Sequence, residues 1–384
     1  MSSAENLERA GAAVSTDLVG LATAAPRYRT PQEKIHRFLA RAIEHTAPVR
    51  RQRAALRILE RVNAVSGIES RNCCVRDYGC DDPAEFEFYP ANWSLAPFPT
   101  TKQRMQTFRR LSQPLVEEAA RKALDQAQVK PEQVTHLVFA TCTGLAQPGP
   151  DILLMQSLGM RPNVARQQLG FMGCYASLNS IQAAEQIVCA QPDAVVLHVS
   201  VETCTLHFQL GEQTDTLVAN TLFADGAAAF VFAAKSPERE SLATVRGAYS
   251  AVEEGTLDQM SWHPGDHGFE MTLSQDVPRT LHEASPTFVA HLCDRAGYAN
   301  DELRAWAIHP GGRRIVEAIA ESLQLNEADT ESSLGVLREH GNMSSATIGF
   351  VLEREFAKRP RGTGPLAALA FGPGLTMEGV IFER

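Results

Sequence analysis

"HLVFATCTG" at residues 136–144 and "RAWAIHPGG" at residues 304–312 share one pattern. Each stretch reads as a buried strand that ends in a sharp turn containing glycine. Cys142 occupies the turn of the first stretch and His309 the turn of the second. The repetition predicts a chain built from two similar halves.

A second pair of motifs follows at matched spacing. "MGCYAS" places Cys174 32 residues after Cys142, and "HGNMSS" places Asn342 33 residues after His309. Each motif has a glycine, then a reactive or polar residue, then small residues that open a helix. The spacing predicts that these four turns meet at one central seam between the halves.

Buried-strand runs alternate with helical stretches along the rest of the chain, which is typical of an α/β layered protein. The polar stretch "AAKSPERE" (233–240) predicts the boundary between a first half, taken as 17–235 after an N-terminal extension at 1–16, and a second half at 236–384. The predicted strands are Val134–Thr141, Ala194–Val201, Ala227–Ala233, Arg304–Ile308, Leu366–Phe371 and Thr376–Phe382.

Bulk composition excludes several classes of protein. The 384 residues carry a net charge of −9, which argues against nucleic acid as a partner. The opening stretch contains acids and no apolar core, and no apolar run reaches the roughly 20 residues of a membrane span. Eight scattered cysteines without a second metal-spaced pair indicate neither a disulfide framework nor a metal site. We therefore expect a cytoplasmic protein.

Cys174 stands directly before a run with helical apolar spacing, which includes Leu178, Ile181 and Ala184. A thiol at a helix start feels the positive end of the helix dipole, and this favours the thiolate. The alternative is a small buried cysteine under a tight turn.

Cys174, His309 and Asn342 together suit chemistry on a thioester. A thiolate is both a nucleophile and a leaving group, a histidine can hold it as an ion pair, and an asparagine donates N–H to a developing oxyanion. Taken alone, His309 could be satisfied by backbone groups, and Asn342 could be a helix N-cap.

Five motifs carry a resemblance to a known family: "PGPD" (148–151), "LFADGAAA" (222–229), "WAIHPGG" (306–312), "GNMSSA" (341–346) and "FGPGLTME" (371–378). With Gly173-Cys174, they resemble the type III polyketide synthases, the chalcone-synthase-like enzymes of the thiolase-fold superfamily. The resemblance implies a thiolase-like fold of two similar α/β halves stacked as α-β-α-β-α layers.

The resemblance also implies a reaction. Cys174 would take an acyl group from a starter acyl-CoA, and His309 and Asn342 would bind malonyl-CoA and stabilise the enolate left by decarboxylation. Backbone N–H groups near Gly372 and Gly374 would form the oxyanion hole, and no cofactor would be needed. Cyclisation would give a pyrone, resorcinol or phloroglucinol-type product.

Other residues are assigned by the resemblance alone. Phe223 and Met271 would gate the cavity, and a flexible Met271 in place of a ring favours a fatty acyl starter. Cys204, His207 and Ser344 would line the cavity. Gln147 would lie on a loop that reaches across a homodimer. Cys204 and His207 follow a pattern closer to bacterial members, and these two could equally be core residues. Arg61, with Arg57 nearby, would bind CoA phosphates, although a solvated helix face explains these arginines equally well.

Three alternatives remain. A fatty-acid-type ketoacyl synthase (KAS III-like) would keep the three residues and take acyl groups from a carrier protein. A non-catalytic scaffold would make the three residues dispensable. A cysteine hydrolase would need no malonyl chemistry.

Overall fold

The computed structural model describes residues 14–384, so most of the predicted extension at 1–16 lies outside the described residues. Its centre is a nine-stranded mixed sheet in the order β11-β12-β13-β8-β1-β7-β6-β4-β5. The strands are β1 (Thr16–Ala24), β4 (His136–Thr141), β5 (Ala165–Gly170), β6 (Val195–Thr203), β7 (Asp225–Ala234), β8 (Ala243–Val252), β11 (Ala305–Ile308), β12 (Pro365–Gly372) and β13 (Thr376–Glu383).

All six predicted strands are confirmed, as β4, β6, β7, β11, β12 and β13, with ends that differ by at most two residues. The prediction missed β1, β5 and β8. β5 is an edge strand whose side chains are mostly exposed, so it lacks the apolar run that marks a buried strand. The predicted division at 235/236 falls in the connection between β7 and β8.

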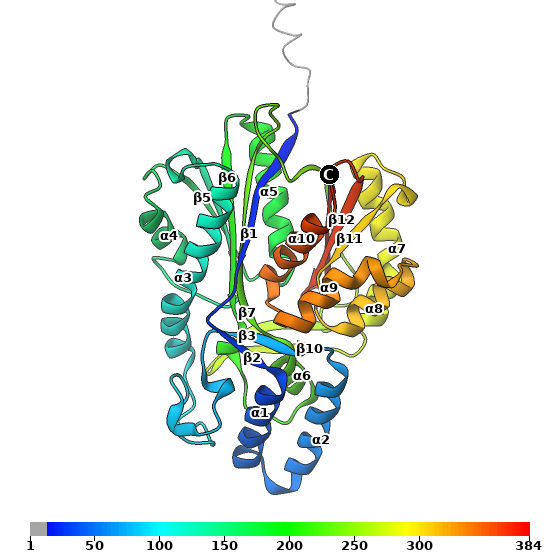
Figure 1. Cartoon of the computed structure of the whole chain (residues 1–384). Helices are drawn as coiled ribbons and strands as arrows, with labels where there is room; N and C mark the ends of the chain where they lie inside the picture. Colours follow the sequence, from blue (N-terminus) through cyan, green and yellow to red (C-terminus); the bar gives the residue numbers. More distant parts are fainter. Residues whose placement is uncertain (1–13) are drawn as a thin grey trace, which may run out of the picture.

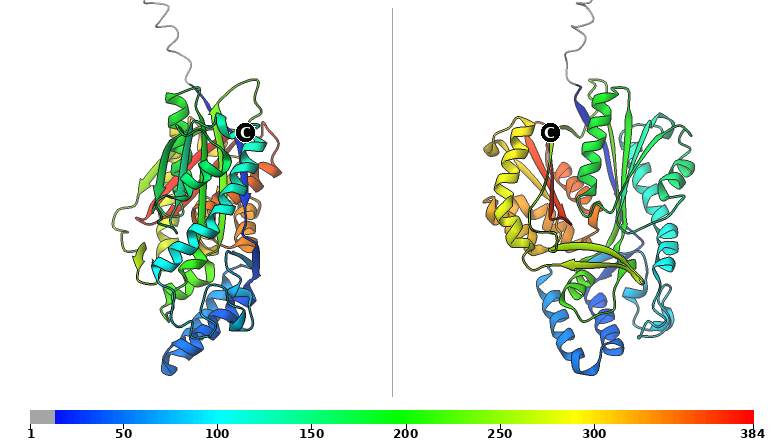
Figure 2. Two further views of the ribbon diagram at one scale, coloured as in Figure 1. Left: turned by 90° about the vertical axis from the view of Figure 1, so that its left-hand side faces the viewer. Right: turned by 180° about the vertical axis from the view of Figure 1, so that it is seen from behind.

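Helices lie between the two halves of the sheet and on their outer faces, so the molecule is built in layers (Figure 1). α5 (Ala176–Ala190) and α10 (Thr347–Lys358) lie in the middle and contact strands of both halves. α3 (Thr101–Gln126), with α4 (Pro150–Leu158) packed on it, covers the outer face of β1, β7 and β6. α7 (Val277–Ala296), with α8 (Arg313–Ser322) packed on it, covers the other outer face, and α9 (Glu327–His340) packs against α8, α10 and the edge strand β11 (Figure 2). This is the thiolase-like layered α/β fold that the sequence predicts.

The strands of the first half (β1, β4, β5, β6 and β7) and those of the second half (β8, β11, β12 and β13) form two half-sheets. β1 joins them into one continuous sheet, which the sequence did not predict. The start of β1 pairs with both β7 and β8, with Thr16 opposite Val245 and Leu18 opposite Ala243.

Small residues allow the middle layer to pack closely between the strands. A Cβ on Gly349 of α10 would lie 2.4 Å from the Cβ of Ala228 in β7, so this position requires glycine.

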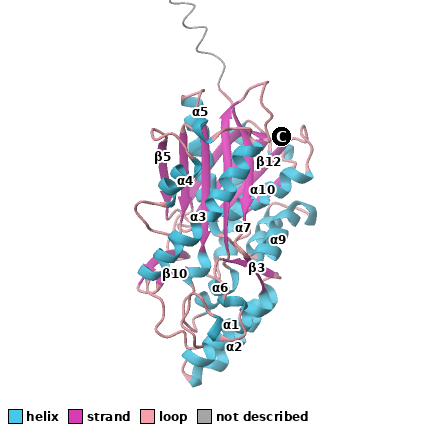
Figure 3. Cartoon of the chain, turned by 60° about the vertical axis from the view of Figure 1, so that its left-hand side comes forward, coloured by secondary structure: helices cyan, strands magenta, loops and turns pink. Residues whose placement is uncertain are grey.

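A smaller group of elements lies beyond one end of the sheet (Figure 3). It contains α1 (Gln32–Thr46), α2 (Val49–Val65), α6 (Thr214–Leu222), the hairpin of β9 (Met260–Gly265) and β10 (Gly268–Leu273), and the pair β2 (Tyr28–Pro31) and β3 (Ser70–Cys73). These elements close the space beside the central turns. Between residues 14 and 384, no helix is long and apolar enough to cross a membrane.

Candidate active site

The four predicted turns meet where β4 and β11 end and where α5 and α10 begin. Within the first half, the Gly173 N–H donates to the Cys142 sulfur at 3.1 Å. Within the second half, the Asn342 side-chain amide donates to the Gly311 carbonyl at 3.1 Å. The Ser177 hydroxyl connects the halves by donating to the Ser345 carbonyl at 2.7 Å. The predicted seam is therefore present.

Cys174 lies two residues before α5 and is buried. The loop that contains Gly372 and Gly374 packs directly against it. A Cβ on Gly173 would lie 2.5 Å from Pro373, and a Cβ on Gly372 would lie 3.3 Å from the Cys174 nitrogen. Two glycines are thus needed for the close approach of this loop to the cysteine.

Asn342 is connected to Cys174 through Ser344. The Asn342 side-chain oxygen accepts the Ser344 N–H at 2.8 Å, and Ser344 interacts with the Cys174 thiol. Asn342 therefore does cap the turn that follows it. This cap fixes the amide so that its nitrogen faces Gly311, leaving one amide hydrogen for a substrate.

His309 follows β11 directly and is only 1% exposed. Neither of its ring nitrogens has a hydrogen-bond partner within residues 14–384. Buried polar groups are normally paired, so the two nitrogens of His309 keep their full capacity to donate and accept hydrogen bonds. The expectation that backbone groups satisfy this side chain is wrong.

Burial disfavours the charged forms of both members of the predicted ion pair, Cys174 and His309. It raises the pKa of Cys174 to about 12, and it lowers the pKa of His309 to about 3. Burial thus opposes the thiolate that a helix start favours, and the ion pair between Cys174 and His309 stays a prediction. Cys174 lies two residues before α5, near the positive end of that helix, which acts against this effect of burial.

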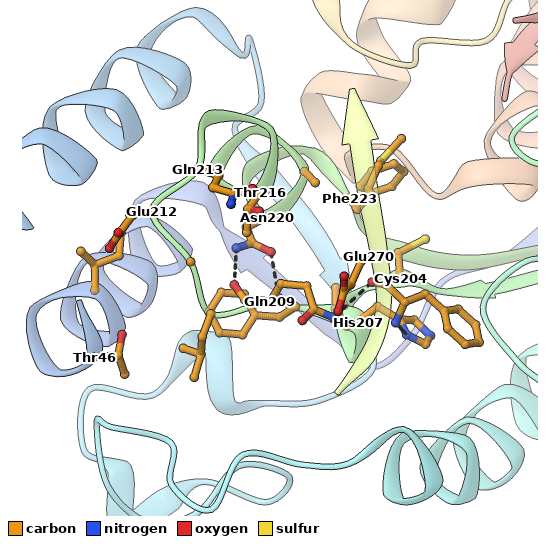
Figure 4. Close-up of a pocket in the computed structure, with 18 of the residues that line it drawn as sticks. Thr46, Cys204, His207, Gln209, Glu212, Gln213, Thr216, Asn220, Phe223 and Glu270 are labelled. Carbon is orange, nitrogen blue, oxygen red and sulfur yellow. Dashed lines mark hydrogen bonds between the residues drawn. The ribbon is translucent and has the colours of Figure 1, made fainter. Parts of the chain in front are cut away.

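Two cavities open from this region. A small one of about 30 Å³ is lined by Cys174, Ser344 and Pro373 among others. A larger one of about 580 Å³ extends between α1, α6 and β10 (Figure 4). Four residues line both cavities and therefore form the wall between them: Cys204, Phe223, Trp262 and Met271.

Some of the remaining predicted residues line the cavities, and others lie outside them. His207 lines the larger cavity but is fully engaged: its Nε2–H donates to the Thr143 carbonyl at 2.8 Å, its Nδ1 accepts from Phe269, and its ring stacks on that of Phe269. Burial lowers the pKa of His207 to about 3, so it is a neutral wall residue. Arg57 and Arg61 are exposed on α2 and line neither cavity, whereas Arg51 lines the larger one and pairs with Glu212.

Gln147 lies apart from Cys174, on a surface groove that it shares with Leu145, Gln168 and Phe171. The groove runs beside β5, the outer strand of the first half-sheet. Within one chain, Gln147 therefore does not line the cavities beside Cys174.

Two residues of the site were missed. Glu202, at the end of β6, is fully buried and accepts hydrogen bonds from the Cys142 N–H and from the hydroxyls of Thr143 and Ser345. Burial raises the pKa of Glu202 to about 7. Trp262 donates to the Cys142 carbonyl at 2.8 Å, which fixes its ring in the wall between the cavities. A charged residue inside the apolar run of β6 was the available signal for Glu202.

The described residues contain no group of three or more side chains suited to hold a metal ion, and the eight cysteines, all within them, are free thiols.

Comparison with known proteins agrees with this geometry. The sequence models for the N-terminal and C-terminal domains of chalcone and stilbene synthases match residues 8–236 and 252–384. The "Alpha-pyrone synthesis polyketide synthase-like Pks18" of Mycobacterium tuberculosis is 30% identical over 95% of this chain and 90% of its own length. "Type III polyketide synthase pspB" of Penicillium soppii is 28% identical over 96% of each chain.

Solved structures agree as well. The PKS-I crystal structure from the brown alga Ectocarpus siliculosus has a TM-score of 0.89 and 30% identity, and covers 97% of this chain and 99% of its own. The C-terminal type III polyketide synthase domain of Steely1 from Dictyostelium has a TM-score of 0.84 at 26% identity over 96% and 99%. The chain belongs to the chalcone and stilbene synthase family.

Within that family, it is a type III polyketide synthase, an acyltransferase that joins acyl units by decarboxylating condensation. The comparisons do not favour the fatty-acid-type ketoacyl synthase.

Proposed function

We propose that Cys174 is the acylated nucleophile and that His309 and Asn342 carry the decarboxylation. The observation that supports this most directly is the pair of unpartnered nitrogens on buried His309, whose turn is held to Asn342 by the bond from the Asn342 amide to the Gly311 carbonyl. A neutral imidazole can donate through one nitrogen and accept through the other, as the two half-reactions require.

In the first half-reaction, the Cys174 sulfur attacks the thioester carbonyl of the starter acyl-CoA. The thiol proton passes to His309 as the C–S bond forms, because burial opposes a free thiolate beforehand. The CoA thiolate leaves and takes that proton. Backbone N–H groups of Cys174 and of the Gly372–Leu375 loop stabilise the oxyanion.

In the second half-reaction, the bond between the malonyl carboxylate and its α-carbon breaks and carbon dioxide leaves. The electron pair becomes an enolate that His309 and Asn342 stabilise through donated hydrogen bonds. The α-carbon then attacks the Cys174 thioester, the Cys174 sulfur leaves as a thiolate that takes a proton from water, and the chain is two carbons longer. The reaction uses CoA thioesters and no cofactor.

The product class is a pyrone, resorcinol or phloroglucinol. The name of the mycobacterial relative, which gives alpha-pyrone synthesis, supports the first. Two features bear on the starter in opposite directions: flexible Met271 in the wall favours a fatty acyl chain, whereas the larger cavity is lined by polar side chains such as Gln209, Gln213 and Asn220.

We further propose a cytoplasmic homodimer. Leu145 is 54% exposed and Phe171 is 36% exposed, and both line the groove beside the edge strand β5. An apolar groove at a free sheet edge suits pairing with a second copy of the chain, with Gln147 in the interface. Eight free thiols suit a reducing compartment.

The test is incubation of the protein with malonyl-CoA and a panel of short, long and oxygen-bearing acyl-CoA starters. Mass spectrometry should detect the starter on the peptide that contains Cys174, and cyclised products two or more extensions longer. An acyl mass on Cys142 or Cys204, or products formed only with an acyl carrier protein, would contradict the proposal.

A further inference from the structure

Arg71, in β3, is a buried charge that the proposed reaction does not use. It is 2% exposed, and within residues 14–384 no carboxylate lies within ion-pair distance of its guanidinium. One of its terminal nitrogens, Nη2, has no hydrogen-bond partner there. Burial of a cation without a directly bonded carboxylate is costly. The Asp225 carboxylate acts on Arg71 only through space, so the direct contacts of Arg71 hold the guanidinium in place.

The first set of contacts holds Phe223, which lines both cavities and which the resemblance assigns to the gate between them. Nη1–H of Arg71 donates to the carbonyl oxygen of Phe223 at 2.6 Å, and Nε–H donates to the Gln32 side chain at 3.0 Å. Gln32 in turn donates to the Thr221 carbonyl at 3.1 Å. Arg71 thus fixes the backbone on which Phe223 enters the wall between the cavities.

The second set of contacts reaches Asn342. The aliphatic part of Arg71 packs on Gly341, where a Cβ would lie 2.8 Å from the Arg71 Cγ. Gly341 has a φ of +78°, and it directly precedes Asn342. The side chain of Arg71 therefore supports the turn that orients the Asn342 amide.

Backbone hydrogen bonds join these two regions. Asn342 N–H donates to the Leu222 carbonyl at 3.0 Å, and Ala224 N–H donates to the Asn342 carbonyl at 2.7 Å. Phe223 and Asn342 consequently lie opposite each other in a short bridge. Arg71 contacts both sides of that bridge.

We propose that Arg71 is a positioning residue that holds the gate residue Phe223 and the decarboxylation residue Asn342 in one fixed arrangement. The inference rests on the proposed function of Asn342. Its removal should impair malonyl-CoA decarboxylation more than acylation of Cys174, because Cys174 is also held by the loop at Gly372 and is linked to this bridge only through Ser344.

Arg71→Ala is expected to lower malonyl-CoA decarboxylation relative to Cys174 acylation by up to about a hundred-fold, the scale of a displacement of about 1 Å. Gln32→Leu removes the bond from Arg71 Nε and the link to Thr221 but keeps the contacts of Arg71 with Phe223 and Gly341, so it should give a smaller change in the same ratio. Arg104→Ala is the matched control, since Arg104 is equally buried but donates to the carbonyls of Pro99 and Leu206. It should lower the melting temperature without the selective loss.

Chemical rescue separates positioning from a general loss of fold. Arg71 lines the larger cavity, so truncation leaves a hole that small solutes can enter from that cavity. Guanidinium chloride below denaturing concentration should restore decarboxylation in Arg71→Ala, whereas sodium chloride at the same ionic strength should not.

Equal losses of decarboxylation and acylation in Arg71→Ala, or an unchanged ratio in a folded variant, would overturn the inference while the proposed function stands. A parent protein that does not decarboxylate malonyl-CoA would overturn both.

Discussion

The side-chain amide of Asn342 donates a hydrogen bond to the carbonyl oxygen of Gly311 at 3.1 Å. This bond joins the turn after β11, which carries His309, to the turn before α10. The side-chain oxygen of the same amide accepts from Ser344, so the orientation of Asn342 is set from both ends. A helix cap and a substrate donor are therefore two uses of one side chain.

Replacement of Asn342 should separate these uses. Asn342→Asp keeps the oxygen that caps Ser344 but loses the N–H donor, so malonyl-CoA decarboxylation should fall by about 10²–10³. Acylation of Cys174, followed by peptide mass spectrometry, should persist. If the variant decarboxylates malonyl-CoA at the parent rate, Asn342 is only a cap.

The reactivity of Cys174 should depend on pH in the manner of a buried neutral thiol. Because burial raises its pKa to about 12, its alkylation rate by iodoacetamide should keep rising with pH through the neutral and mildly alkaline range. Exposed Cys189 serves as the internal control in the same digest. A rate that is constant from slightly acidic pH upwards would instead reveal a preformed thiolate–imidazolium pair.

Glu202 should make stability depend on pH. Its pKa in the folded protein is about 7, above the ordinary value of 4.5, so the native state binds this proton more tightly than the unfolded state. Its contribution is full below pH 4.5 and is lost as pH rises through 7, by about 3 kcal/mol in total. Relative to Glu202→Gln, the free energy of unfolding of the parent should therefore decrease from pH 5 to pH 8. Urea titrations that show a constant difference would refute this.

Met271 should influence which starters are accepted. Met271→Phe places a rigid ring in the wall between the cavities and should narrow the starter range towards shorter acyl chains, while acylation by acetyl-CoA continues. Each methylene in such a pocket is worth about 1–3 kcal/mol of discrimination, so competition between starters is the suitable assay. An identical starter profile would show that Met271 does not limit entry.

The groove beside β5 should form the homodimer interface. Phe171→Asp introduces a charge into that groove and should convert a dimer into a monomer in sedimentation velocity. Leu257→Asp is the control, because Leu257 is 79% exposed and lies outside the groove. Dissociation by the control alone would place the interface elsewhere.

The sequence by itself determined the features that depend on local pattern. Six strands follow from short buried apolar runs, and the turns at Cys142, Cys174, His309 and Asn342 follow from glycines and small residues at matched spacing. Because duplicated halves must pack their equivalent ends together, this pattern was also enough to predict that the turns meet.

Only the tertiary structure decided what each environment does to a side chain. Glu202 and Arg71 belong to residue types that are usually exposed, and only the packed layers make them buried. The pairing of β1 with β8, the engagement of His207 and the exposure of Arg57 and Arg61 likewise depend on segments far apart in the chain. The pKa values of Cys174 and His309 have the same origin: removal from water disfavours the charged form, and no local sequence pattern records how much water the fold excludes.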